Sequence, residues 1–208
     1  MFKRENILIL VLIIFYSVGI IGTHLPSYKQ SLLELSYFNL VLSFSILIFA
    51  RQNELKRFLL FLFFAFLIGM SVEWVGVHTG LLFGDYMYGC NLGTKVFGVP
   101  LVIGLNWGLL TVVSASIINR QSINQNFNII SGAALMTVFD FIMEPVAVKS
   151  GFWVWPKGEI PFYNYLCWFV VSLILQFIYS RMKLVESNKV NDVLLFCMVV
   201  FFVTLNIF

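Results

Sequence analysis

The sequence predicts an all-α integral membrane protein, built as a bundle of about seven transmembrane helices. Of its 208 residues, 60% are apolar and only 11% are charged, and the mean hydropathy is +0.93. Soluble domains typically carry about 25% charged residues. Seven near-continuous apolar stretches, each close to the roughly 20 residues that a helix needs to cross a bilayer, take up most of the chain. We therefore expect one polytopic membrane domain, residues 1–208.

The first three stretches are bounded by basic residues. Lys3 and Arg4 precede the first, which continues past the small residues where a signal peptide would be cut. A first span is therefore favoured over a cleaved signal peptide, which remains the alternative. The second stretch ends at Arg51, and the third begins after Arg57.

The last four stretches have similar boundaries. The fourth ends before Arg120, the fifth ends at Lys149, the sixth ends before Arg181, and the seventh is the carboxyl-terminal run. Hydropathy places the seven spans at about 7–22, 32–50, 58–77, 98–118, 128–148, 162–180 and 193–208.

The basic residues between the spans predict the orientation. With a cytoplasmic amino terminus, nine of the thirteen lie inside: Lys3, Arg4, Arg51, Lys56, Arg57, Arg120, Arg181, Lys183 and Lys189. The other side holds only Lys29, Lys95, Lys149 and Lys157. Because cytoplasmic loops are enriched in Lys and Arg, we expect the amino terminus inside and the carboxyl terminus outside. The net charge of +3 thus reflects topology and does not indicate a nucleic-acid partner.

Three acidic residues lie well inside the predicted spans: Glu73, Asp140 and Glu144. An ionisable side chain in a bilayer costs at least a few kcal/mol, so each needs a partner or a function. In the predicted topology all three lie in the outer half. Asp140 is deepest, roughly 12 Å from the outer end of its span, at the same depth as Asn106. The structural alternative is that the acids pair with lysines or tryptophans and stabilise the bundle.

Aromatic residues are concentrated on the same side. All five tryptophans and seven of the eight tyrosines fall in the outer half or outer loops of the predicted topology. An interfacial aromatic belt should mark both faces of the membrane, so a belt explains only part of this asymmetry. Trp74 beside Glu73, and Trp107 beside Asn106, indicate a pocket for an apolar ligand with one reacting end.

The sequence lacks the residues that several classes of reaction require. The last span contains no lysine for a retinal Schiff base, paired acid-rich motifs for prenyl diphosphates are missing, and His78 and His24 are too few for a metal oxygenase. Three cysteines, Cys90, Cys167 and Cys197, have no metal-like spacing. What remains is acid chemistry without a cofactor or metal: a buried carboxyl group protonates an alkene, and aromatic faces stabilise the cation.

Five ordered blocks make the chain similar to a known family. They are 73–88, 98–100 leading to Asn106-Trp107, Asp140-Phe-Ile-Met-Glu-Pro-Val-Ala-Val148, Gly151-Phe-Trp-Val-Trp155 and Ile160-Pro-Phe-Tyr-Asn164. In this order they resemble the membrane carotenoid-biosynthesis family that contains the carotenoid 1,2-hydratases, of the gamma-carotene and bisanhydrobacterioruberin hydratase type. The resemblance implies addition of water to the terminal 1,2 double bond of an acyclic carotenoid end group such as that of lycopene, giving a tertiary alcohol.

Carried over to this sequence, the resemblance implies that Asp140 is the proton donor, that Glu144 and Asn106 orient the water, and that Glu73 is the rival donor. The substrate-binding candidates are Trp74, Trp107, Tyr86, Tyr88, His78, Trp153, Trp155 and Asn164. Carotenoid and membrane lipid are the expected partners, together with other enzymes of the pathway, and the expected location is the cytoplasmic membrane. A lycopene cyclase-like end-group cyclase and a non-catalytic carotenoid-binding or assembly protein remain the alternatives.

Overall fold

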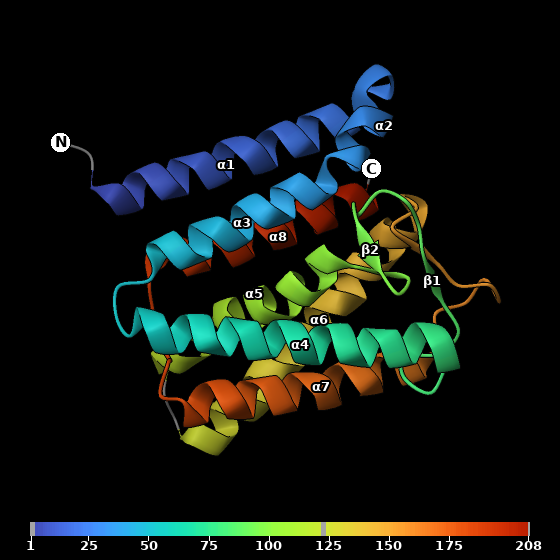
Figure 1. The fold of residues 1–208 in the computed structure, drawn as a ribbon. Coiled ribbons are helices and arrows are strands. Elements are labelled where there is room, and N and C mark those ends of the chain that lie inside the picture. Colours follow the sequence, from blue (N-terminus) through green and yellow to red (C-terminus); the bar gives the residue numbers. More distant parts are fainter. Residues whose placement is uncertain (1–2, 122–123, 208) are drawn as a thin grey trace.

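A computed structural model describes residues 3–121 and 124–207 as a bundle of roughly antiparallel helices (Figure 1). The helices are α1 (Arg4–Thr23), α2 (Pro26–Glu34), α3 (Ser36–Ala50), α4 (Leu55–Thr79), α5 (Leu101–Ile118), the short 3₁₀ turn η1 (Asn119–Gln121), α6 (Gln125–Lys149), α7 (Phe162–Arg181) and α8 (Lys189–Ile207). The short strands are β1 (Met87–Tyr88), β2 (Lys95–Val96), β3 (Val99–Pro100) and β4 (Trp153–Val154).

The predicted membrane architecture is confirmed. Among the described residues, six helices are long and apolar enough to cross a membrane, and α2 with α3 make a seventh span if the pair is counted as one. The two ends of the chain lie at opposite ends of the bundle (Figure 1), as an odd number of crossings requires. Which end faces the cytoplasm stays a prediction from the basic residues.

The second predicted span is not one straight helix. The stretch predicted at 32–50 is divided between α2 and α3, which meet at Leu35 with a bend of 55°. Pro26 begins α2, where its missing N–H costs nothing. The apolar run that hydropathy detects is therefore mostly α3, and α2 lies across the end of the bundle.

Helix α5 forms the centre of the bundle. Its apolar window is 78% buried, against 22–44% for the other five long helices. The helix starts at Leu101 instead of the predicted residue 98, because Val99–Pro100 pair with Lys95–Val96 as a two-stranded hairpin. Pro100 then occupies the amino-terminal cap position of α5.

The two long loops that follow α4 and α6 meet at one end of the bundle. Strand β1 pairs antiparallel with β4, so that Tyr88 lies opposite Trp153 (Figure 1). Gly89 extends the pairing by donating its N–H to the carbonyl of Phe152. A Cβ at this position would clash with the carbonyl oxygen of Gly151. The absence of a side chain therefore allows the two loops to close over the helix ends.

Candidate active site

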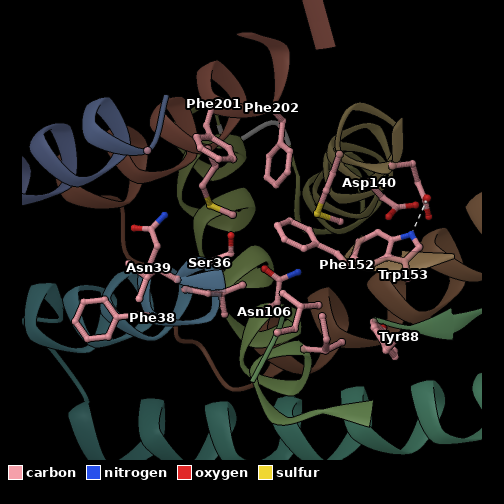
Figure 2. A pocket seen from close by; sticks show the side chains of 18 of the residues that line it. Ser36, Phe38, Asn39, Tyr88, Asn106, Asp140, Phe152, Trp153, Phe201 and Phe202 are labelled. Atoms are coloured by element: carbon pink, nitrogen blue, oxygen red, sulfur yellow. Dashed lines mark hydrogen bonds between the residues drawn. The ribbon is translucent and has the colours of Figure 1, made fainter. Parts of the chain in front are cut away.

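A cavity of about 430 Å³ lies beneath these paired loops and extends between the helices to α1 and α3. Most of its lining is aromatic or aliphatic. Figure 2 shows Asp140, Trp153 and Tyr88 on one side of the cavity, and Phe38 and Asn39 on the other. All three intramembrane acids line it. Acidic side chains from two separate helices, α4 and α6, thus meet at one apolar cavity.

Glu73 of α4 accepts three hydrogen bonds in the interior. Its Oε2 accepts from the hydroxyl groups of Tyr86 at 2.5 Å and Tyr88 at 2.7 Å. Its Oε1 accepts from Nε1 of Trp107 at 3.0 Å. An indole N–H only donates, so this arrangement suits a carboxylate, whose oxygens accept. Glu73 is therefore well supported as an anion.

Two glycines on α4 make room for these donors. Gly69 lies one turn before Glu73 and Gly76 nearly one turn after it, so all three share a helix face. A Cβ on Gly69 would lie 2.6 Å from Cδ1 of Trp107, and a Cβ on Gly76 would lie 2.7 Å from the hydroxyl oxygen of Tyr86. Gly69 and Gly76 are therefore close-packing positions.

The two tyrosines remain hydrogen-bond donors across the physiological pH range. Burial, and then the nearby Glu73 charge, raise the pKa of the Tyr86 phenol above its ordinary value. The same causes, in the same order, raise the pKa of Tyr88. A phenol whose pKa rises above 10 stays protonated at neutral pH. Glu73 therefore keeps both of its hydroxyl donors under working conditions.

On α6, Asp140 and Glu144 lie one turn apart and share a single donor. Nδ2 of Asn164, from the first turn of α7, lies 2.9 Å from Oδ2 of Asp140 and 3.3 Å from Oε1 of Glu144. The other oxygen of Glu144, Oε2, accepts from Nε1 of Trp153 at 2.9 Å and from Nε1 of Trp155 at 3.2 Å. The aromatic pair in the loop thus holds Glu144 in place.

Asp140 has the weakest support as an anion. It is fully buried, and its Oδ1 has no hydrogen-bond partner among the residues that the structure describes. Among the described residues, no salt bridge involves any of the three acids. Glu73 and Glu144 each have three donors, while Asp140 has only the amide that it shares. If the pair holds one proton, hydrogen bonding therefore favours placing it on Asp140.

Asn106 of α5 lines the same cavity and is almost completely buried. In the described part of the chain its side chain makes no hydrogen bond, including the one to Asp140 that equal depth suggested. An amide in an apolar cavity normally has a partner. Asn106 is therefore free to bind a polar group that enters the cavity.

The tryptophans are divided between different environments. Trp107 stacks on Trp168 of α7 at 4.0 Å between ring centroids, fully buried behind the cavity wall. Trp168 itself lines the cavity, with Trp153 and Trp155. The expectation that Trp107 lines the pocket is corrected: it holds Glu73 from behind, and Trp168 presents the aromatic face.

Trp74 and His78 lie outside the cavity lining, contrary to expectation. Trp74 is 45% exposed on the outer surface of α4. His78 is exposed one turn later, where its ring packs on Trp74 and its Nδ1 lies 2.9 Å from the Trp74 carbonyl oxygen. Successive residues on a helix point about 100° apart, so Glu73 facing inward turns Trp74 outward. The remaining predicted residues, Tyr86, Tyr88, Trp153, Trp155 and Asn164, do line the cavity.

The sequence reasoning missed Trp168, Phe83 and Phe152 as cavity-lining aromatics. Phe83 and Phe152 lie inside the recognised blocks 73–88 and 151–155, and Trp168 lies one helical turn after Asn164; these positions are the signal that was available. For metals, the described residues contain no group of three or more His, Cys, Asp and Glu side chains able to hold an ion.

Residues 33–208 match the model of a family described as carotenoid biosynthesis protein. The chain belongs to this carotenoid biosynthesis family. The matched region contains the three intramembrane acids, Glu73, Asp140 and Glu144, and all the helices except α1 and most of α2. Membership in the carotenoid biosynthesis family therefore applies to the part of the chain that builds the site.

Among curated proteins, the chain is 28% identical over 130 residues to bisanhydrobacterioruberin hydratase of Haloarcula japonica. The alignment covers 55% of this chain and 43% of the hydratase, so it spans less than half the length of that relative. No solved structure matches the chain.

Proposed function

We propose that this carotenoid biosynthesis protein is a hydratase that adds water to the terminal 1,2 double bond of an acyclic carotenoid end group without a cofactor. The observation that carries the proposal is Asp140: a buried carboxyl group with one shared donor, at the end of an apolar cavity. The similarity to a hydratase supports the reaction class. A protonated acid beside an apolar ligand has the ingredients for alkene protonation.

In the proposed reaction, Asp140 transfers its proton to C2 of the end group. The electron pair of the double bond forms the new C–H bond, which leaves a tertiary cation at C1. The oxygen of a water molecule then attacks C1, and the carboxylate left on Asp140 takes the surplus proton from that oxygen. The acid is regenerated, and the net change is the addition of one water.

Aromatic faces and polar groups around the acid support the later steps. Trp168, Trp153 and Trp155 surround the reacting end of the cavity, and their ring faces attract a cation. Glu144 is fixed by its indole donors and lies next to Asp140, which suits it to orient the attacking water. Asn106, with its free amide, is the second group proposed to hold that water.

Glu73 is the rival donor, but its surroundings favour another role. Three donors stabilise its anion, whereas Asp140 has one shared donor, so hydrogen bonding favours Asp140 over Glu73 as the group that holds a proton. We propose that Glu73 places negative charge near the developing cation. Electrostatic stabilisation of this kind is often a large part of catalysis.

The decisive experiment is expression in cells that accumulate lycopene or another acyclic carotenoid, with mass spectrometry of the pigments. A hydratase gives products heavier by one or two waters. An isomer of unchanged mass would instead indicate the cyclase alternative. Pigment left chemically unaltered across several acyclic substrates would refute both enzymatic proposals and leave a carotenoid-binding or assembly role.

We also propose that the protein lies in the cytoplasmic membrane with its amino terminus inside and the paired loops outside. The multi-pass architecture and the nine-to-four division of basic residues support this orientation. Other enzymes of the carotenoid pathway, which share an apolar substrate that stays in the bilayer, are the proposed neighbours.

A further inference from the structure

The cavity reaches the surface of the molecule on one side. Among the described residues that line it, four are exposed: Phe15 at 40%, Val18 at 55%, Leu35 at 51% and Phe38 at 49%. Two belong to α1, one lies at the break between α2 and α3, and one lies in the first turn of α3. The four exposed lining residues, hereafter the mouth, thus place an opening between α1 and the bent pair.

The opposite end, where the acids lie, is closed. Leu92, Phe152, Trp153 and Trp155 are all less than a tenth exposed and line the cavity under the paired loops. Strand pairing between β1 and β4 ties the two loops together above them. Among the described residues, these buried side chains and the paired loops therefore block the way past the acids for a long ligand.

The mouth opens toward hydrocarbon. All four of its side chains are apolar, and α1 is long and apolar enough to span a membrane. Phe15 lies eight residues before the end of α1, which is roughly 12 Å along the axis at 1.5 Å per residue. The rings of Phe15 and Phe38 form a tilted aromatic pair at the mouth, with centroids 6.5 Å apart. At that depth the surroundings are lipid tails instead of water.

We propose that the mouth is a lateral portal through which a linear polyene hydrocarbon enters from the bilayer, one end first, until that end reaches the acids. This inference rests on the proposed function for the identity of the substrate. A cavity of about 430 Å³ is in the size range that encloses a drug-sized molecule, which is smaller than a whole carotenoid. The rest of the chain therefore lies in the mouth and in the lipid beyond it.

The test closes the mouth reversibly. In a Cys90→Ser background, Phe15→Cys and Phe38→Cys are joined by a short bis-methanethiosulfonate reagent, in protein reconstituted into lipid nanodiscs. Cys167 and Cys197 are buried and stay unchanged. The matched control joins Phe141→Cys and Tyr165→Cys. Their rings are 5.4 Å apart on α6 and α7, and neither residue lines the cavity.

Two readouts are followed: conversion of an acyclic carotenoid, and quenching of tryptophan fluorescence by the bound polyene. We expect loss of both when the mouth is cross-linked, recovery after reductant, and no change for the cross-linked control pair. Full conversion and binding with a cross-linked mouth would overturn the portal. Equal losses in both cross-linked pairs would also overturn it, because the effect would then come from holding helices together.

A second variant tests the same passage without cysteines. Gly19 lines the cavity on α1, where an added Cβ would lie 3.2 Å from Cε2 of Phe201 on α8. Gly19→Leu should therefore obstruct the passage and abolish polyene quenching, whereas Ile14→Leu, an exposed position outside the lining, should not. If wild-type protein quenches but converts no pigment, the hydratase proposal fails while the portal stands. Unchanged quenching in Gly19→Leu would count against the portal alone.

Discussion

The substitution Asp140→Asn tests whether the acidic proton of Asp140, and not only the shape of its side chain, is needed for activity. The shared Asn164 amide lies 2.9 Å from one carboxyl oxygen and 3.3 Å from the other, so these two oxygens are at most 6.2 Å apart, the sum of the two distances. Two unit charges at that separation repel by about 3 kcal/mol at an effective dielectric constant of about 20. The cost corresponds to roughly a hundredfold penalty on ionising both groups. We therefore expect the pair to hold one proton.

The amide variant keeps the shape and accepts the Asn164 hydrogen bond through its carbonyl oxygen, but it carries no comparably acidic proton. Loss of a general acid costs about 10²–10⁴ in rate, so pigment conversion should fall by that factor. Polyene quenching of tryptophan fluorescence should remain. The midpoint of thermal unfolding should not fall, because the amide replaces a carboxyl group that already holds the proton of the pair and is therefore neutral.

The assay is the rate of water addition by purified protein in nanodiscs, read by chromatography and mass spectrometry. Conversion by Asp140→Asn within a few-fold of wild type, together with loss in Glu73→Gln, would transfer the donor role to α4. If the amide variants of all three acids fold and stay active, the carboxylates are structural and the mechanism is wrong.

Glu144→Gln should slow hydration, so that the cation more often loses a proton and returns to an alkene. In heavy water this appears as deuterium in the unhydrated substrate, and recovery of undeuterated substrate alone would count against the role of Glu144 in orienting the water. Trp107→Phe removes the indole donor of Glu73 and should destabilise the fold by about 1–3 kcal/mol. Thermal unfolding measures this loss against the exposed control Trp74→Phe, and equal stability of the two variants would contradict the hydrogen bond. In intact spheroplasts, Lys157→Cys should react with an impermeant thiol reagent and Lys56→Cys only after permeabilisation, both in the Cys90→Ser background; the reverse result would invert the orientation.

The sequence was sufficient to predict most of the helices and to single out the three intramembrane acids. Asp140 and Glu144 are four residues apart, which places them on one helix face. The depth of Glu73 in α4 brings it to the same layer. Asn164 was identified through its family block, but its position between two carboxyl groups depends on how α6 and α7 pack, which no single segment encodes.

Facing directions were harder to predict, because the helices that matter are apolar on every side. On α4, lipid-facing and core-facing residues are equally hydrophobic, so nothing in the pattern assigns Trp74 to the surface. On α5, burial on nearly all sides hides which face Trp107 takes. The break at Leu35 was missed because the residue is neither Gly nor Pro, and apolar residues lie within two positions on both sides of it.

The position of the mouth has a consequence for the order in which the proposed hydratase would form its products. A linear pigment with two equivalent ends presents only one of them to the acids, since the other end remains in the lipid beyond α1 and α3. To react at both ends, the molecule must withdraw, turn around in the bilayer and enter again. If the proposed hydration is correct, we therefore expect the singly hydrated pigment to be a free intermediate that competes with fresh substrate for the protein and accumulates before any doubly hydrated product forms.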